Sequence, residues 1–405
     1  MELKPGYQRT EAGLVPKEWT STRVCELGIV VTGGTPSTSE PTYWNGDRPW
    51  VTPTDITGQR DIFESERMIS DAGLRSIRAL PANSVLVTCI ASIGKNAILR
   101  SAGGCNQQIN AVVPSDAHKA EFLYYVFEAA KTYLLANAGT TATSIVSKAV
   151  FQQLVFSIPP LPEQRAIAEA LSDADALLDG LDRLIAKKRD LKQAAMQQLL
   201  TGKTRLPGFS GEWKPLVFGD LASPGMDRVN PKLTGGHAFC VELEHIEQKT
   251  GRLLGWSETA PQSSLKAVFA ADDVLFGKLR AYLRKYWHAS MPGVCSTEIW
   301  VLKAKSAVAP GYLYQLVQTD WFIDAASTAY GTHMPRSDWK VVRDLELRVP
   351  RKDEQAKIAG VLGDMDAEID ALKRRRDKAY DLKHAMMQEL LTGKTRLVAP
   401  EADHA

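Results

Sequence analysis

Two stretches of the chain carry apolar residues at alternating intervals of four and three positions. The apolar positions are Ile167, Leu171, Ala174, Leu178, Leu181 and Ile185 in the first stretch and Ile358, Leu362, Met365, Ile369 and Leu372 in the second. Such spacing is typical of a coiled coil, in which an apolar stripe faces a partner helix. The pattern predicts two long helices packed on each other. The residues predicted at their interface are Leu171, Leu178, Leu181, Leu362, Ile369 and Leu372.

The two stretches are copies of one segment. Residues 163–206 align without a gap to residues 354–397, and 26 of the 44 aligned positions are identical. Each residue of the second copy lies 191 positions after its counterpart, as Glu354 does after Glu163. Internal repetition of this kind divides the chain into two halves of similar plan. The first predicted helix, residues 163–201, would extend roughly 58 Å at about 1.5 Å per residue.

Charge is distributed unevenly along both copies. Each copy is acidic in its first half and basic in its second half. Parallel packing would set like charges side by side, whereas antiparallel packing would set each acidic half against the basic half of the other copy. The sequence therefore predicts an antiparallel pair. The same polarity also complements the helix dipole, and that explanation alone requires no particular orientation.

The remaining sequence forms two modules with a similar order of elements. In the first, we expect strands at residues 28–32, 84–88, 110–113 and 154–158, an apolar helix at 120–136, and loops at 43–50 and 139–144. In the second, we expect strands at residues 273–276, 298–302 and 345–347 and a helix at 311–326. The predicted fold class is α+β. Two similar globular α/β domains are joined by two long helices packed as an antiparallel coiled coil, with a pseudo-twofold internal repeat.

We divide the chain accordingly into five segments. Residues 1–158 form the first domain and residues 159–206 the central repeat helix, while residues 207–349 form the second domain and residues 350–397 the C-terminal repeat helix. The last segment, residues 398–405, is predicted to be a disordered tail.

Composition narrows the class of protein. The chain has 405 residues, of which 44% are hydrophobic and 24% charged, as in globular proteins with ample core. A formal net charge of +2 means that any nucleic-acid contact depends on local basic patches. We find no apolar run of membrane-spanning length and no signal peptide, so we expect a soluble, cytoplasmic protein without membrane association. The five cysteines are scattered without a C-x-x-C motif, which favours reduced thiols over structural zinc.

Motifs of catalysis are incomplete. The G-K-T sequences that begin at Gly202 and Gly393 resemble the end of a P-loop, but glutamine stands where the motif needs its first glycine, and a predicted helix precedes them. Glu247 and Lys249 have the E-x-K spacing of some nucleases, without a Pro-Asp pair anywhere in the chain. The seven histidines lack metal-binding spacing. The sequence thus predicts neither a catalytic centre nor a metal site.

Polar and basic loops with interspersed aromatic residues remain as candidate binding surfaces. Residues 278–285 carry four bases and one tyrosine directly after a predicted strand. Arginine and lysine suit phosphates and guanine edges, and asparagine and glutamine suit adenine. The candidate DNA-binding residues are Thr35, Tyr43, Trp44, Arg48, Lys95, Gln107, Gln108 and Thr140 in the first module and Lys278, Arg280, Tyr282, Arg284, Lys285, Thr332, His333 and Arg336 in the second.

These features together resemble the specificity subunit of type I restriction-modification enzymes. The resemblance rests on two variable modules, each followed by a near-identical helix that opens after P-L-P or P-R-K-D with E-Q and closes with L-L-T-G-K. The G-G-T-P sequence at residues 33–36, the Tyr43-Trp44 and Pro49-Trp50 pairs, residues 273–283 and Gly331-Thr332 are also similar to that family's target recognition domains.

The resemblance implies a non-enzymatic subunit. Each target recognition domain would recognise one half of a split, asymmetric sequence in double-stranded DNA, and the helix pair would set the gap and dock two methyltransferase subunits. Those partners would methylate adenine with S-adenosylmethionine, and restriction subunits, where present, would cut DNA with ATP and Mg²⁺. The chain itself would bind no cofactor. It departs from a typical DNA-binding protein in that its first module has 14 basic and 14 acidic residues and its second a net charge of only +1.

Two other interpretations stay open. An architectural protein could use the helix pair to hold partner proteins without sequence-specific DNA binding, and a lack of protected bases would favour it. An enzyme could carry an active site that motif comparison does not detect, and activity of the isolated chain on DNA with Mg²⁺ would favour that.

Overall fold

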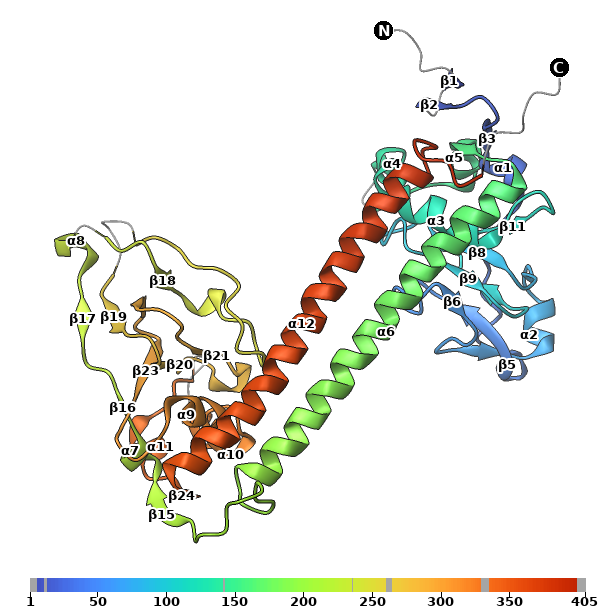
Figure 1. Ribbon diagram of the computed structural model, residues 1–405. Coiled ribbons are helices and arrows are strands. Elements are labelled where there is room, and N and C mark those ends of the chain that lie inside the picture. Colours follow the sequence, from blue (N-terminus) through green and yellow to red (C-terminus); the bar gives the residue numbers. More distant parts are fainter. Residues whose placement is uncertain are drawn as a thin grey trace. The chain divides into compact units, whose positions relative to one another are not determined.

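The computed structural model describes residues 6–10, 13–140, 143–234, 236–259, 264–328 and 335–398 (Figure 1). The chain separates into two compact units. Unit 1 comprises residues 1–181 and 375–405, and unit 2 comprises residues 182–374. Each unit therefore holds one globular domain together with the start of one long helix and the end of the other.

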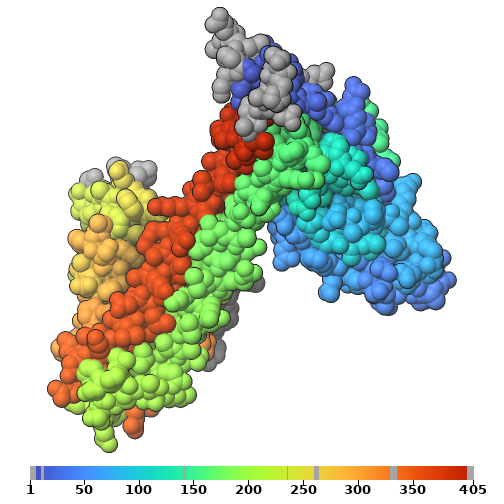
Figure 2. Space-filling view, turned by 45° about the vertical axis from the view of Figure 1, so that its right-hand side comes forward, coloured from blue at the N-terminus to red at the C-terminus, as the bar shows by residue number. Residues whose placement is uncertain are grey.

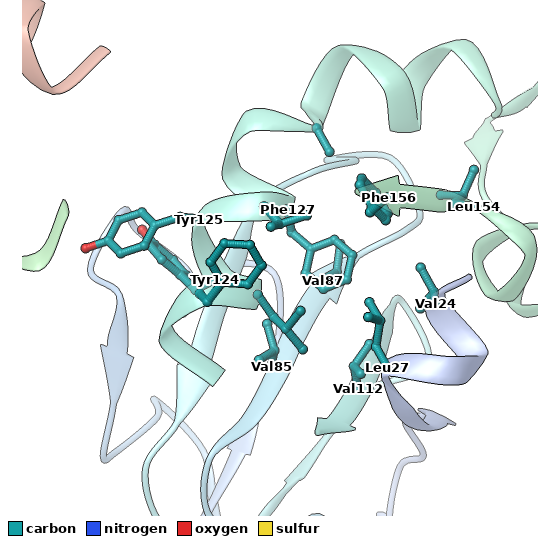
Figure 3. Close-up of a cluster of buried hydrophobic side chains, with 14 of the residues drawn as sticks. Val24, Leu27, Val85, Val87, Val112, Tyr124, Tyr125, Phe127, Leu154 and Phe156 are labelled. Atoms are coloured by element: carbon teal, nitrogen blue, oxygen red, sulfur yellow. The ribbon is translucent and has the colours of Figure 1, made fainter. Parts of the chain in front are cut away.

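The centre of unit 1 is a five-stranded sheet in the order β4-β11-β8-β9-β6. Every residue of its middle strand β8 is buried. Successive side chains of a strand point to opposite faces. Here Val85 and Val87 join the core beneath helix α3 (Ala120–Ala129), while Leu86 joins a second core on the other face. Figure 3 shows Val85, Val87 and Phe127 pointing into the first of these cores. The strands are β4 (Gly28–Thr32), β11 (Ile109–Pro114), β8 (Ser84–Thr88), β9 (Asn96–Leu99) and β6 (Asp61–Ile62).

Smaller elements surround this sheet. A three-stranded sheet has the order β10-β5-β7, and three two-stranded sheets pair β1 with β2, β3 with β14, and β12 with β13. The strands are β1 (Tyr7–Thr10), β2 (Gly13–Pro16), β3 (Thr20–Arg23), β5 (Trp44–Val51), β7 (Met68–Ile69), β10 (Gly104–Cys105), β12 (Gly139–Thr140), β13 (Ser144–Ile145) and β14 (Val155–Ile158). The short helices are α1 (Val24–Leu27), η1 (Pro41–Tyr43), α2 (Asp71–Arg75), α3 (Ala120–Ala129), α4 (Lys131–Ala136) and α5 (Lys148–Gln153).

Unit 2 is built on two four-stranded sheets, in the orders β16-β23-β20-β21 and β17-β19-β22-β18. Strand β20 is buried throughout and divides its side chains between two cores, as β8 does in unit 1. The strands are β15 (Lys214–Val217), β16 (Ala222–Pro224), β17 (Arg228–Val229), β18 (Cys240–Val241), β19 (Lys266–Phe269), β20 (Val274–Gly277), β21 (Tyr286–His288), β22 (Gly293–Ser296), β23 (Ile299–Ala304) and β24 (Glu346–Val349). The short helices are α7 (Phe218–Leu221), α8 (Pro231–Thr234), η2 (Leu243–His245), η3 (Ala281–Leu283), α9 (Pro310–Leu316), α10 (Asp320–Ala326) and α11 (Trp339–Arg343).

The strands predicted from the sequence are present, but two predicted helices and two predicted loops are corrected. Residues 120–136 form α3 and α4 with a break at Ala130, whose ψ of 5° leaves the helical region. Residues 311–326 form α9 and α10, because the Thr319 side chain caps the start of α10. Residues 43–50, predicted as a loop, lie largely in β5, where burial of Trp50 stabilises an extended segment with an aromatic sequence. The predicted loop at 139–144 includes the paired strands β12 and β13.

Both repeat segments form helices of 39 residues, α6 (Leu161–Leu199) and α12 (Lys352–Leu390). In unit 1, Lys383 near the end of α12 lies 2.6 Å from Asp175 of α6. In unit 2, Lys192 near the end of α6 lies 2.6 Å from Asp366 of α12. Within each unit the start of one helix thus packs against the end of the other, which confirms the antiparallel pairing. Within the described residues, no helix is long and apolar enough to cross a membrane.

The predicted seam residues differ in burial. Leu171 and Leu362 are fully buried because each also belongs to the core of its own unit. Leu181 and Ile369 are buried as well. Two further seam residues, Leu178 and Leu372, are only half-buried.

A buried glutamate near the start of each long helix forms an ion pair with an arginine that follows the end of the other helix. Glu163 accepts two hydrogen bonds from the Arg396 guanidinium, at 2.6 and 2.9 Å, and one from Trp19 Nε1 at 2.9 Å. Glu354 accepts two from Arg205, at 2.6 and 2.7 Å. Each arginine follows the end of one helix and each glutamate begins the other. The two clusters therefore link equivalent positions of the repeat.

A buried glutamine fixes each helix start to its domain. The Gln164 amide donates to the carbonyls of Pro159 (2.9 Å) and Ala117 (3.1 Å) and accepts from Lys119 N (3.0 Å). Its counterpart Gln355 makes the same three bonds with Pro350, Ala307 and Ala309. Each glutamine is 1% exposed, and its bond to the proline carbonyl is buried, so that carbonyl has no replacement water.

The cysteines form no disulfide, in accordance with the prediction of free thiols. Cys25 is exposed and the other four are buried. Burial raises the pKa of Cys89 to about 11 and that of Cys105 to about 12, which keeps both thiols protonated at neutral pH.

We expect Gln164→Ala to lower the free energy of unfolding by about 1–3 kcal/mol, because it leaves the buried Pro159 carbonyl unsatisfied and removes the bonds to Ala117 and Lys119. Urea denaturation of the full chain measures this change. The control Gln197→Ala removes an exposed glutamine from the same helix and should shift stability by less than about 0.5 kcal/mol. Equal stability of both variants would contradict the assigned role.

Candidate nucleic-acid interface

Two predicted polar residues of unit 1 lie together at one edge of its domain. Thr35 follows β4 and donates a hydrogen bond of 2.7 Å to Gln107 Oε1, which lies just before β11. Both side chains are exposed. The loop approaches so closely that a Cβ on Gly33 would lie 2.2 Å from the Asn106 carbonyl oxygen. Glycine at position 33 therefore permits the close approach that joins Thr35 to Gln107, which lies 72 residues later in the sequence.

An aromatic pair adjoins this loop. The rings of Trp44 and Trp50 meet edge to face with centroids 5.2 Å apart. Their indole N–H groups donate to the carbonyls of Ser37 at 3.1 Å and Gly34 at 2.8 Å. These bonds tie the aromatic pair to the segment that carries Thr35. The cluster therefore combines an amide, a hydroxyl and aromatic rings, groups that contact bases in protein–DNA complexes.

One basic residue of this cluster, Arg67, is not among the candidates predicted from the sequence. The exposed Arg67 guanidinium lies 3.7 Å from the centroid of the Trp44 ring and 5.2 Å from that of Trp50. Its position directly before β7 carries no motif, and only the pairing of β7 with β5 brings it to the tryptophans. Arg67 is a cation held over aromatic faces at a polar edge.

Two further predicted residues lie near this cluster. Arg48 pairs with Asp71 at 2.9 Å and lies 3.6 Å from Asp47, and the hydrogen bond that it donates to Asp71 raises the arginine pKa. Its charge is therefore already matched. Tyr43 is half-buried, and its carbonyl accepts a bond from the Ser70 amide.

The remaining predicted residues of unit 1 lie in three places: between β8 and β9, directly before β11, and in β12. Lys95 is exposed and donates to the Pro53 carbonyl at 3.3 Å. The Gln108 amide oxygen accepts a bond of 3.0 Å from Asn106 Nδ2. The backbone of Thr140 pairs with Ser144 in the β12-β13 hairpin, and its side chain lies outside the described residues.

The basic run of unit 2 divides into two groups. Arg280 is exposed and Tyr282 is 52% exposed. In contrast, Arg284 pairs with Asp320, and the Lys285 ammonium donates to the Leu243 carbonyl at 2.5 Å. Burial lowers the Lys285 pKa. Among these four residues, Arg280 and Tyr282 are therefore the ones free to meet a ligand at the surface.

A second segment lies beside this run. The Arg280 amide donates to the Pro335 carbonyl at 2.9 Å, and the Ser337 amide donates to the Lys278 carbonyl at 2.9 Å. This pairing brings Arg336 to the same edge, where its guanidinium contacts Glu298 at 2.9 and 3.2 Å. The predicted residues Thr332 and His333 lie outside the described residues.

The same edge recurs in both units. In unit 1 the Cys89 amide donates to the Gln108 carbonyl and the Cys89 carbonyl accepts from the Val146 amide. In unit 2 Lys278 makes the two equivalent bonds, with Glu298 and Ser337. The backbone frame is thus shared. The side chains on it differ, because glutamine stands in one unit where glutamate stands in the other.

The part of the chain that the structure describes contains no group of three or more His, Cys, Asp or Glu residues that could hold a metal ion.

Comparison with known proteins connects this architecture to a family. Residues 16–187 match the family model of the type I restriction modification DNA specificity domain. The chain is 33% identical to the MjaIX specificity subunit of Methanocaldococcus jannaschii over 43% of this chain and 41% of that protein. It is 31% identical to the HindI specificity subunit of Haemophilus influenzae over 36% of this chain and 33% of that protein. The matched region thus spans less than half the length of these two relatives.

Other similarities extend over nearly the whole chain. The EcoDI specificity subunit of Escherichia coli is 22% identical over 94% of this chain and 88% of that protein. The S subunit structure of a type I restriction-modification system from M. genitalium has a TM-score of 0.58 at 14% identity, over 96% of this chain and 98% of that one. At this identity the structural likeness concerns the fold alone. Residues 16–187 thus carry a match to the specificity domain, and the chain as a whole is similar to type I restriction enzyme specificity subunits.

Proposed function

We propose that this chain is the DNA-recognition subunit of a type I restriction-modification complex. Each unit would recognise one half of a bipartite, asymmetric target in double-stranded DNA. The observation that carries the proposal is the edge with the same backbone hydrogen bonds in both units, around Cys89 in unit 1 and Lys278 in unit 2. The same backbone frame bears Gln108 in unit 1 and Glu298 in unit 2, with differing exposed polar and basic neighbours. Because the two edges differ chemically, the two half-sites should differ in sequence.

The exposed groups suit distinct parts of DNA. Arg67 and Arg280 carry guanidinium groups that fit phosphate oxygens or the guanine O6 and N7 acceptors. Gln107 can donate and accept, as adenine recognition requires. Glu298 can accept from the cytosine amino group, and its pairing with Arg336 orients both side chains before DNA binds.

The proposed role is non-catalytic. Methylation and cleavage would be the work of partner subunits, which would hold S-adenosylmethionine, ATP and Mg²⁺. This chain would supply the target and the docking surfaces.

The long helices offer equivalent surfaces for two copies of a partner. Parts of α6 and α12 are open on the face shown in Figure 2. Leu191 of α6 is 48% exposed, and its counterpart Leu382 of α12 is 59% exposed. Leucines at corresponding exposed positions of a repeat suit two identical subunits, each covering one apolar position. We propose that the methyltransferase subunits dock here.

The proposal as a whole is tested by co-expression with the neighbouring methyltransferase and sequencing of modified bases in host DNA. We expect methylated adenines confined to one split, asymmetric motif. Methylation that does not depend on this chain would contradict a recognition role and favour a scaffold. The motif found here also supplies the duplex for binding assays.

We expect Arg280→Ala to weaken binding of that duplex about tenfold or more, because one exposed contact to phosphate or guanine is worth about 1–3 kcal/mol. Fluorescence anisotropy at fixed salt measures the change. Arg348→Ala, at an exposed position of β24, removes the same charge elsewhere in unit 2 and should have little effect. Assembly with the methyltransferase should stay intact in both variants. An unchanged affinity of Arg280→Ala would contradict the assignment of Arg280 as a DNA contact.

We expect Leu191→Asp and Leu382→Asp each to reduce the bound methyltransferase from two copies to one, because a charge replaces an apolar contact. Native mass spectrometry of the assembled complex measures the stoichiometry. Ala186→Asp introduces the same charge at an exposed position on another face of α6 and should retain two copies. Two copies in all three variants would rule out this docking surface.

A further inference from the structure

Unit 2 contains a pocket whose lining is strongly basic. Its volume is about 330 Å³, and its walls come from α6, α12 and the segments around Lys249 and Arg284. Five cationic side chains and two carboxylates line it, together with the polar residues Gln193, Thr250 and Gln318. The charged residues are Arg189, Lys192, Lys249, Arg284, Lys373, Asp366 and Asp370.

Three of the cations are already matched within the protein. Lys192 is 9% exposed and contacts Asp366 and Gln318, at 2.6 and 2.8 Å. Lys373 lies 3.6 Å from Asp370 and 3.7 Å from Glu247. Arg284 pairs with Asp320.

The other two cations, Arg189 and Lys249, are exposed, and neither has an ion-pair partner among the described residues. Like charges near one cavity repel each other unless an anion or solvent lies between them. The pocket therefore carries excess positive charge at the side chains that are free to move toward a ligand.

Two of the cationic residues that line the pocket have an uncommon backbone conformation. Lys249 and Arg284 have φ values of 64° and 53°, in the left-handed region that residues with a Cβ rarely adopt. The Lys249 amide donates to the Arg284 carbonyl at 2.9 Å, so the two residues are held together. Strained residues of this kind concentrate at binding sites, where the surrounding structure fixes them. The E-x-K spacing noted in the sequence has its explanation here, since Glu247 binds Lys373 and Thr250 while Lys249 faces the pocket.

The equivalent position of unit 1 shows that the fold does not require these charges. There the ion pair between Lys383 and Asp175 corresponds to that between Lys192 and Asp366. However, Tyr380 stands at the place of Arg189, and the groove beside it is lined by Tyr133 and Phe156 together with charged residues such as Lys131 and Glu128. The shared ion pair is structural, whereas Arg189 has no cationic counterpart at the equivalent position of unit 1.

We propose that this pocket binds a small oligophosphate, such as the phosphate chain of a nucleoside polyphosphate. Arg189 and Lys249 would contact the phosphates directly, and the exposed Gln193 amide would donate a hydrogen bond. Two unmatched cations beside one pocket favour a multivalent anion over a single carboxylate, because arginine and lysine bind phosphate oxygens through charge-assisted bonds. The volume is in the range of small-ligand sites. The inference is independent of the DNA-contacting edge, since Arg280, Tyr282 and Arg336 do not line the pocket.

The test is isothermal titration of the full chain, in complex with any subunits that co-purify, with sodium tripolyphosphate. We expect saturable binding that weakens at least tenfold in the double variant Arg189→Gln, Lys249→Gln. The control Arg183→Gln, Lys187→Gln removes two exposed charges from α6 outside the pocket and should bind as the wild type does. Thermal unfolding without ligand should be the same for all three proteins, because both altered pocket side chains are exposed.

Three results would overturn the proposal. The first is no binding by the wild-type protein, and the second is equal weakening in the control, which would indicate only general charge attraction. The third is displacement of tripolyphosphate by duplex DNA together with weaker DNA binding in the pocket variant. That result would assign the cations to the DNA backbone instead of a free ligand.

Discussion

The buried carboxylate at the start of each long helix is the interaction on which each unit depends. Glu163 and Glu354 are each 2% exposed, and a guanidinium that follows the end of the other helix satisfies each of them. Removing the arginine from such a pair leaves the buried carboxylate without its charge partner, which destabilises the fold. The pair therefore holds two distant parts of the chain together. The two helices are antiparallel because each pair joins the start of one helix to the residues that follow the end of the other.

The domain and the adjoining helix ends share one hydrophobic core. In unit 1, Ile167 and Leu171 from the start of α6 and Met387 and Leu390 from the end of α12 belong to the same core as the β-sheet. The buried glutamine adds hydrogen bonds between the helix start and the loop before the domain helix. A domain anchored in this way presents its loops on a rigid base. Rigidity at the base is what sequence recognition by surface loops requires.

The shared scaffold carries surfaces that differ. The backbone bonds around Cys89 in unit 1 recur around Lys278 in unit 2, but the side chains on the two edges do not match. The pockets beside the helix ends differ in the same way, with Tyr380 in one and Arg189 in the other. Buried contacts constrain both copies alike, whereas exposed positions are free to change. The repeat thus preserves the framework and varies what it contacts.

The sequence by itself determined the repeat, the two long helices and their antiparallel pairing, because apolar periodicity and charge polarity act along one segment and need no knowledge of the rest. It also located strands β8 and β20, whose runs of buried residues are local signals. Only the tertiary structure decided which basic residues reach the surface. Arg284 and Lys285 resemble Arg280 in sequence, yet Asp320 and the Leu243 carbonyl bind them internally. Arg67 carries no local signal and reaches Trp44 only through strand pairing. Contacts between residues far apart in the chain decide such cases, and a local pattern of residue types does not contain them.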